Sequence, residues 1–222
     1  MKIHAEALLF DNDGTLVSSL ESVDRCWTRW ASEYGIAAED FARVELHGRP
    51  AVEIIAELLT GDRAAGIPQA LARIEQLEVE DVPGGVELLP GTKELLSSLP
   101  EGRWAVVTSA TRPLAEARLR EAGIDAPVVI AADDITRGKP DPEPYLLAAA
   151  RLGVDPARCV VFEDAPAGLT AGRAAGMTTV ALATTHDRGE LVADVVVTDL
   201  SEVTAQATAD GVAITAGVRQ SA

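Results

Sequence analysis

The segment that decides the fold is Leu8–Leu16, which reads LLFDNDGTL. Its apolar beginning, Ala7–Phe10, has no polar alternation, which is typical of a strand buried on both faces of a parallel sheet. Open α/β sheets bind ligands outside the carboxyl ends of their strands, where Asp11 and Asp13 lie. Two carboxylates so close together repel each other and need a cation. Taken alone, the motif is also compatible with a turn or a calcium loop, but it lacks the further ligands of an EF-hand.

Similar short apolar runs recur along the chain and alternate with segments that have helical boundaries. The further predicted strands are Trp104–Val107, Val128–Ala131, Cys159–Phe162, Thr179–Leu182 and Val195–Val197. The predicted helices are Thr92–Leu99, Pro113–Ala122, Pro142–Leu152 and Ala165–Ala175, several of which begin with proline and stop at glycine. This alternation predicts a Rossmann-like α/β fold of three layers around a parallel sheet with right-handed crossovers.

One region lacks strand candidates and has helical periodicity instead. Ser18–Glu21 has the pattern of a capping box, and an aromatic stripe follows it at helical spacing. A second helix is expected from Pro50, with Val52, Ile55, Leu58 and Leu59 inward, and a third carries Ile67, Leu71, Ile74 and Leu77. We therefore predict a small α-helical domain over residues 18–85, inserted into a core of residues 1–17 and 86–222. The last twenty residues, from about Glu202, receive no assignment.

The charge of the chain limits its partners. The 222 residues include 19 Lys and Arg against 35 Asp and Glu, which gives a formal net charge of −16. Such a field repels nucleic acid and anionic membranes, so we expect neither as a partner. No stretch approaches the ~20 apolar residues of a membrane span, and the N-terminus lacks the pattern of a signal peptide. We expect a cytoplasmic protein in which any anionic ligand is bound by a local cation.

Three more polar segments follow predicted strands. Thr108 and Ser109 follow the second strand, Lys139 lies in a Gly-Lys-Pro turn, and Glu163 and Asp164 end another strand. Taken alone, the hydroxyl pair has an ordinary interpretation as a helix cap, and the lysine as a surface residue. Two acidic strand ends in one parallel sheet, however, form a cluster of carboxylate oxygens. Such ligands, without His or thiolate, favour Mg²⁺.

The order of these pieces is more specific than any of them alone. Asp-x-Asp-Gly-Thr from Asp11, then Thr108-Ser109, Gly138-Lys139-Pro140 and Glu163-Asp164, resembles the four motifs of the haloacid dehalogenase-like (HAD) hydrolase superfamily. The resemblance extends from Ala5 to about Val197. The predicted helical insert is similar to the small α-helical cap of that superfamily, which closes over the substrate.

The resemblance implies roles for individual residues. Asp11 would attack phosphorus and form an aspartyl-phosphate, and Asp13 would act as general acid and then base. Thr108, with Ser109 and Ala110, would hold phosphoryl oxygens, while Lys139 would offset the negative charge. The implied metal ligands for Mg²⁺ are the Asp11 carboxylate, the Asp13 backbone carbonyl and the Asp164 carboxylate, with Glu163 binding directly or through water.

Within the superfamily, the residues favour phosphatases of sugar or polyol phosphates. Dehalogenases use no metal, so Asp13 and the acidic pair Glu163-Asp164 argue against them. Phosphosugar mutases of the β-phosphoglucomutase type carry a histidine twelve residues after the nucleophile, where this chain has Val23. The mutase and a non-catalytic phosphate-binding module remain the alternatives. The expected partner is a small phosphorylated metabolite, and the expected state is a monomer or weak dimer.

In the insert, His47, Gly48 and Arg49 resemble a segment that such caps use for substrate contact. Ordinary loop residues are the alternative interpretation. If Arg49 contacts the substrate, Arg49→Ala lowers kcat/KM for sugar phosphates by roughly tenfold or more, because a hydrogen bond from a charged group is lost. The loss on an aryl phosphate such as p-nitrophenyl phosphate is smaller. Steady-state kinetics on both substrates test this, and equal losses would show that Arg49 is no specificity contact.

Overall fold

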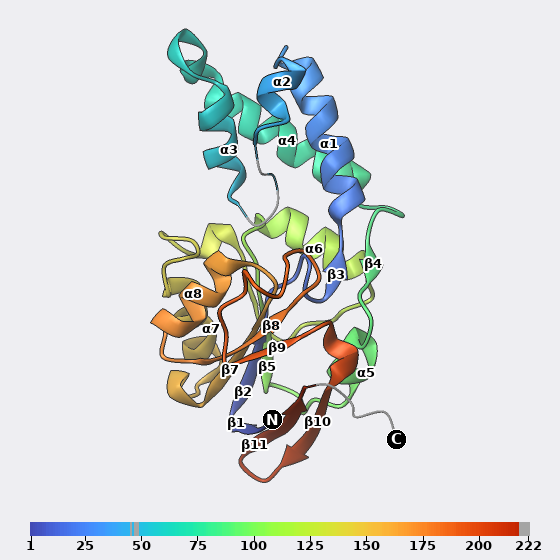
Figure 1. The fold of residues 1–222 in the computed structure, drawn as a ribbon, viewed down its shortest axis with the longest axis vertical. Helices are drawn as coiled ribbons and strands as arrows, with labels where there is room; N and C mark the ends of the chain where they lie inside the picture. The colour runs from blue at the N-terminus through green and yellow to red at the C-terminus, as the bar shows by residue number, and fades with distance from the viewer. Residues whose placement is uncertain (45, 47–48, 218–222) are drawn as a thin grey trace.

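The computed structural model describes residues 1–44, 46 and 49–217, and its centre is a six-stranded parallel sheet (Figure 1). The strand order is β6-β5-β2-β7-β8-β9. The strands are β2 (Ala7–Phe10), β5 (Trp104–Val107), β6 (Val129–Ile130), β7 (Cys159–Glu163), β8 (Thr178–Leu182) and β9 (Val195–Val197). All neighbouring pairs run parallel, so the prediction of a parallel α/β sheet is confirmed. The first predicted strand, β2, lies in the middle of the sheet.

Helices cover both faces of this sheet and complete the three layers. They are α5 (Thr92–Ser97), α6 (Arg112–Glu121), α7 (Glu143–Leu152) and α8 (Pro166–Ala174). Alternate residues of β2 belong to different cores: Leu8 and Phe10 pack on the face of α5 and α6, and Leu9 on the face of α7 and α8. None of the helices in the described part of the chain is long and apolar enough to cross a membrane.

The predicted helical insert lies beyond one edge of the sheet (Figure 1). It contains α1 (Leu20–Glu33), α2 (Ala38–Phe41), α3 (Ala51–Leu58) and α4 (Ile67–Asp81), with a 3₁₀ segment at Gly61–Gly66. These helices share an apolar core of their own, which includes Trp27, Trp30, Ile55, Ile74 and Leu77. Two short strands, β3 (Val17–Ser18) and β4 (Glu87–Leu88), pair antiparallel where the chain enters and leaves the insert.

Two local predictions for the insert are wrong. No capping box forms, because helix α1 has Ser19 as its N-cap and the Ser19 side chain makes no bond to the helix backbone. Its hydroxyl donates a hydrogen bond to Asp13 instead. Val52 does not point inward but is 46% exposed, because α3 turns Ile54 and Ile55 toward the core of the insert.

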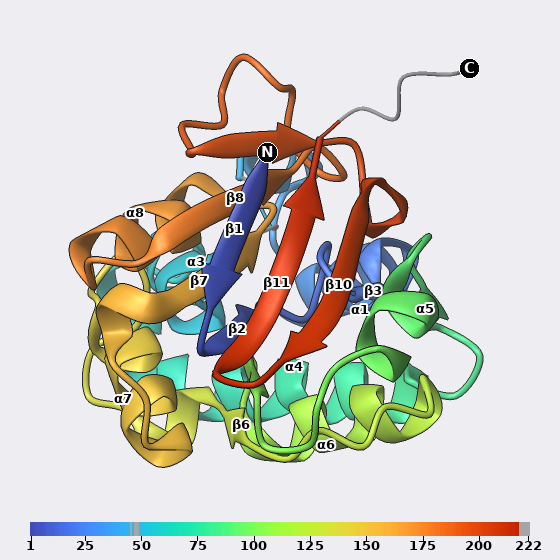
Figure 2. The same ribbon diagram turned by 90° about the horizontal axis from the view of Figure 1, so that it is seen from below.

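The C-terminal segment that received no assignment forms a hairpin. Strands β10 (Val203–Thr208) and β11 (Gly211–Ala216) pair antiparallel, and β11 also pairs with β1 (Lys2–Ala5). This three-stranded sheet lies at the end of the core farthest from the insert (Figures 1 and 2). Its buried side chains, among them Ile3, Val212 and Ile214, join the core on one face of the main sheet.

Because Ile214 is 1% exposed, we expect Ile214→Ala to destabilise the protein by about 2–5 kcal/mol, as other large-to-small core changes do. The neighbouring Thr215 points to solvent, so Thr215→Ala is the matched control and changes stability little. Denaturant unfolding of both variants measures the difference. Equal free energies of unfolding for Ile214→Ala and Thr215→Ala would show that the hairpin does not unfold together with the core.

Candidate active site

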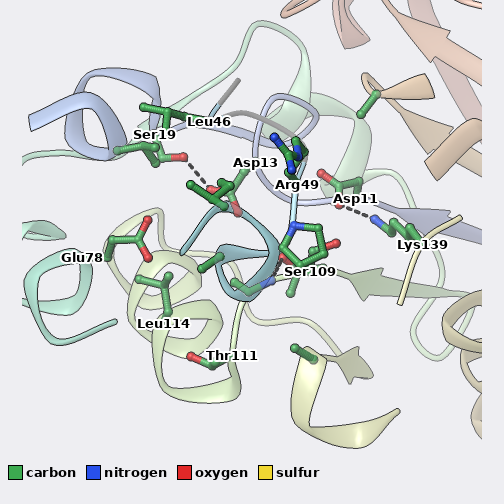
Figure 3. Close-up of a pocket in the computed structure, with 18 of the residues that line it drawn as sticks. Asp11, Asp13, Ser19, Leu46, Arg49, Glu78, Ser109, Thr111, Leu114 and Lys139 are labelled. Carbon is green, nitrogen blue, oxygen red and sulfur yellow. Dashed lines mark hydrogen bonds and ion pairs between the residues drawn. The ribbon is translucent and has the colours of Figure 1, made fainter. Parts of the chain in front are cut away.

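The polar residues that follow different strands meet at one edge of the sheet. Strand β2 pairs with β5 on one side and β7 on the other, with Phe10 opposite both Val106 and Phe162. This register brings Asp11, after β2, beside Thr108, after β5, and Glu163, at the end of β7. Figure 3 shows Asp11 paired there with Lys139, which comes from the loop before α7.

Lys139 is the centre of the hydrogen bonding at this edge. Its Nζ lies 2.5 Å from Asp11 Oδ1, 2.6 Å from Glu163 Oε1 and 2.9 Å from the Val107 carbonyl oxygen. An ammonium group has three donors, so these contacts use all of them. Burial alone lowers the pKa of Lys139, but the attraction of Asp11 and Glu163 outweighs it and holds the pKa above its ordinary value. The lysine therefore stays charged at neutral pH.

The neighbouring carboxyl groups are shifted in the direction that burial dictates. Burial raises the pKa of Asp11 well above its usual range, and Glu163 and Asp164 add to the rise while Lys139 opposes it. Burial, with the charge of Glu163, raises the pKa of Asp164 to about 7. Burial is the largest cause of both shifts and the neighbouring carboxylates add to it, so a bound cation would stabilise the charged form of both groups.

Three of these carboxylates fit a divalent metal ion. Asp11, Glu163 and Asp164 are buried, and each offers an oxygen within 4.8 Å of the others. An all-oxygen donor set of this kind suits a hard ion such as Mg²⁺. The carboxylate of Asp13, the fourth predicted ligand residue, is not in this cluster; only its backbone carbonyl was predicted to bind.

Small and hydroxyl residues hold the two acids of the last motif in place. Glu163 accepts a hydrogen bond from the Tyr145 hydroxyl at 2.8 Å, and a Cβ on Gly168 would lie 1.7 Å from its Oε1. Asp164 accepts a hydrogen bond from the hydroxyl of Thr185. Gly14 has φ +85°, and a Cβ there would lie 2.1 Å from Asp164 Oδ2. The glycines are thus required by the close approach of these carboxylates.

The predicted acid/base Asp13 has both of its carboxylate oxygens engaged. Ser19 Oγ donates to Oδ1 at 2.7 Å, and the guanidinium of Arg118 lies 3.0 Å from Oδ2. Asn12 Nδ2 also donates to Oδ2 at 3.2 Å. The carboxylate therefore has a fixed orientation, which a general acid or base requires.

The predicted phosphate-binding residues lie beside Asp11. Thr108, Ser109 and Ala110 all line the same cavity as Asp11 and Lys139. The Thr108 side chain is nearly fully buried, and its hydroxyl accepts a hydrogen bond from the Ala110 amide at 3.1 Å. This bond orders the turn after β5, which brings its backbone to the predicted nucleophile.

The cavity has a volume of about 260 Å³ and lies between the insert and the core. Its walls combine the reactive groups with side chains of the insert, including Val23, Trp27, Ile74, Glu75 and Glu78. Arg49 also lines it, 3.0 Å from Glu57, whereas the predicted contact residues His47 and Gly48 lie outside the described residues.

Several residues of the site were missed by the sequence analysis. Tyr145 and Thr185 contact Glu163 and Asp164, and Arg118 contacts Asp13, but none of them belongs to a motif. Each reaches the site from a helix or loop distant in sequence from its partner. Thr15, in contrast, is part of the first motif and lies 3.3 Å from Asp164.

Comparisons with known proteins show the family of the chain. The family model described as haloacid dehalogenase-like hydrolase matches residues 5–176. Hexitol phosphatase A of Escherichia coli (strain K12) is 40% identical over 91% of this chain and 94% of its own length. Validoxylamine A 7'-phosphate phosphatase of Streptomyces hygroscopicus subsp. limoneus is 39% identical, over 88% of this chain and 94% of its own.

Solved structures are similar as well. CbbY from Rhodobacter sphaeroides, in complex with phosphate, superposes with a TM-score of 0.78 at 29% identity, over 89% of this chain and 96% of the other. The protein belongs to the haloacid dehalogenase-like hydrolases. It is therefore an enzyme of the hydrolase class, as the order of its motifs predicted.

The raised pKa of Asp164 makes metal binding depend on pH. Below about pH 7 a divalent ion must displace a proton from Asp164, and the pKa of Asp11 is raised as well, so Mg²⁺ affinity rises with pH through this range. Titration calorimetry at several pH values measures the slope, with Asp164→Asn as the control that binds weakly. An affinity independent of pH would contradict the assignment of Asp164 as a ligand.

Proposed function

We propose that this protein is a Mg²⁺-dependent phosphatase that hydrolyses a small phosphomonoester, a sugar phosphate or polyol phosphate, through an aspartyl-phosphate at Asp11. The single observation that carries the proposal is the buried cluster in which Lys139 and three carboxylates meet at the cavity. The two relatives named above are named as phosphatases, and one of them is hexitol phosphatase A. We extend that activity to this chain because its site combines a buried acidic cluster with a lysine beside the predicted nucleophile.

In the proposed first step, Asp11 provides the nucleophilic oxygen. Lys139 orients its carboxylate through Oδ1, and the turn of Thr108, Ser109 and Ala110 binds phosphoryl oxygens. Asp13, at the boundary with the insert, donates a proton to the oxygen of the departing alcohol. Asp11, Asp164 and the Asp13 backbone carbonyl, with Glu163 directly or through water, would hold Mg²⁺. The ion supplies positive charge that lets an anionic carboxylate approach an anionic phosphate.

In the proposed second step, the phosphoryl group on Asp11 is hydrolysed. Asp13 has lost its proton to the alcohol and now takes one from a water molecule, which attacks phosphorus and releases phosphate and free Asp11. Lys139 enters the reaction charged, because Asp11 and Glu163 hold its pKa above the ordinary value. One pair of aspartates thus serves both half-reactions.

We propose that residues 18–85 act as a cap over a core of residues 1–17 and 86–222. The cap contributes most of the apolar cavity wall, including Val23, Trp27 and Ile74, and closes the site away from water. Arg49 is placed on the cap side, where it is available to a substrate hydroxyl or phosphate. The cytoplasmic location and the monomeric or weakly dimeric state stay predictions.

The two alternatives find less support. A mutase would need a titratable group at the start of the cap, but Val23 lines the cavity there with an apolar side chain. A module that only binds phosphate would have no use for the ordered Asp13 carboxylate beside the predicted nucleophile. Hydrolysis therefore accounts for more of the site than either alternative.

The proposal predicts that Asp11→Asn abolishes turnover while the fold is kept. Loss of a nucleophile costs about a thousandfold or more in kcat, because the covalent step is lost. The measurement is phosphate release from sorbitol 6-phosphate, glycerol 1-phosphate and glucose 6-phosphate, each with and without Mg²⁺. Release that needs both Mg²⁺ and Asp11 is expected.

Asp141→Asn is the matched control. Asp141 lies in the same loop as Lys139, but its carboxylate is paired with Arg137 at 3.1 Å and does not belong to the acidic cluster. We expect it to retain activity. Normal release by Asp11→Asn would refute the nucleophile assignment. No release by the wild type, together with isomerisation that a sugar bisphosphate activates, would establish the mutase instead.

A further inference from the structure

A buried arginine links the proposed acid/base to the cap. Arg118 lies in α6, a core helix, and is only 5% exposed. Its Nη1 is 3.0 Å from Asp13 Oδ2, and its Nη2 is 3.7 Å from Glu78 Oε1 on the cap helix α4. One guanidinium therefore contacts an acid of the core loop and an acid of the cap at the same time.

Arg118 is buried and Glu78 is largely buried, so each charge is stabilised by the other. The Glu78 side chain is only 12% exposed, and burial raises the pKa of its carboxyl to about 7 although Arg118 opposes the rise. A buried guanidinium without carboxylate partners would be strongly destabilising. Its planar fork fixes the direction of each partner, which a lysine would do less well. Arg118 thus fixes the position of Asp13 as well as neutralising charge.

A second contact joins the same two helices. The Thr111 hydroxyl, at the start of α6, donates a hydrogen bond to Glu75 Oε1 at 2.6 Å. Glu75 and Glu78 lie one turn apart on α4, so both acids contact the side of α6, and both line the cavity. In Figure 3, Glu78 and Thr111 both lie below Asp13. Arg118 therefore lies at the contact between the cap helix α4 and the core helix α6.

We propose that Arg118 is a positioning residue for Asp13, and that Glu78 acts through Arg118 so that the alignment of the acid/base depends on the cap being seated. Ser19, at the start of the cap, holds Asp13 Oδ1, and Arg118 holds Oδ2. With both oxygens held, the carboxylate is fixed in direction before the substrate enters. This inference rests on the proposed phosphatase function.

If Arg118 positions Asp13, its loss affects alkyl and aryl phosphates differently, which the loss of a purely structural residue would not do. An alcohol leaves only when Asp13 protonates it, whereas p-nitrophenolate is a stable anion that departs without a proton. Misalignment of Asp13 therefore lowers kcat/KM for an alkyl phosphate more than for p-nitrophenyl phosphate. Since kcat/KM covers the steps up to departure of the leaving group, the later hydrolysis of the aspartyl-phosphate does not enter the ratio.

The experiment measures kcat/KM for sorbitol 6-phosphate, or for the best alkyl phosphate of the panel above, and for p-nitrophenyl phosphate, with Mg²⁺ present. For Arg118→Met we expect the alkyl value to fall about tenfold to a hundredfold more than the aryl value, within the ~10²–10⁴ that acid–base catalysis contributes. Arg118→Lys restores part of the loss. Arg120→Met, an exposed position of the same helix, is the matched control and leaves both values unchanged.

Glu78→Gln tests the link to the cap. We expect kcat/KM for the alkyl phosphate again to fall more than the aryl value, but by less than in Arg118→Met. Combining Glu78→Gln with Arg118→Met should cause no additional loss, because the effects of residues that act through one another are not additive. Circular dichroism and thermal unfolding check each variant. If Arg118→Met does not fold, Arg118→Lys and Glu78→Gln decide the question through the same ratio.

Equal losses on both substrates, or no loss, would overturn the positioning role of Arg118. Losses from Glu78→Gln and Arg118→Met that multiply would overturn the link through Glu78. A wild type that releases no phosphate from any substrate would refute the proposed function itself. The failures of the two proposals are thus distinguishable.

Discussion

The buried ion pairs of Lys139 are the interaction on which the rest of the site depends. Removing a single charged group from water costs several kcal/mol, so a lysine and two acids share this edge only because the lysine pairs with both of them. The sheet order makes the arrangement possible, since β2 lies between β5 and β7 and brings Asp11, Val107 and Glu163 within reach of one ammonium group. The negative charge that Lys139 leaves unbalanced is what favours a divalent ion.

The proposed catalytic groups belong to the core, but the insert completes their surroundings. Asp11 and Lys139 are held by core elements alone, whereas Asp13 is held by Ser19 at the start of α1 and by Arg118, which also meets Glu78 of α4. The proposed nucleophile is thus held without the insert, and the proposed acid/base is not. In the proposed mechanism, this division separates phosphate binding, which is the same for every phosphomonoester, from recognition of the alcohol, which differs between substrates.

The sequence predicted those parts of the fold that local pattern determines. Short apolar runs gave all six strands of the parallel sheet, and the acids and lysine at their ends were brought together at the cavity. The antiparallel hairpin after Glu202 was missed because its Ala- and Thr-rich strands alternate only weakly in hydropathy. Arg118 was missed for another reason: a lone arginine on an amphipathic helix resembles a surface residue, and its burial results from partners 105 and 40 positions away, as Asp13 and Glu78 show.

The most direct test of the account is to trap the covalent intermediate. The enzyme would be mixed with Mg²⁺ and its best phosphomonoester, quenched during turnover and treated with borohydride, which reduces an acyl phosphate but not a free carboxylate. Tandem mass spectrometry of the peptide that contains Asp11 and Asp13 then locates the modified residue. If Asp11 is the nucleophile, reduction occurs at Asp11 alone and depends on substrate. Reduction at Asp13, or none while turnover proceeds, would contradict this assignment.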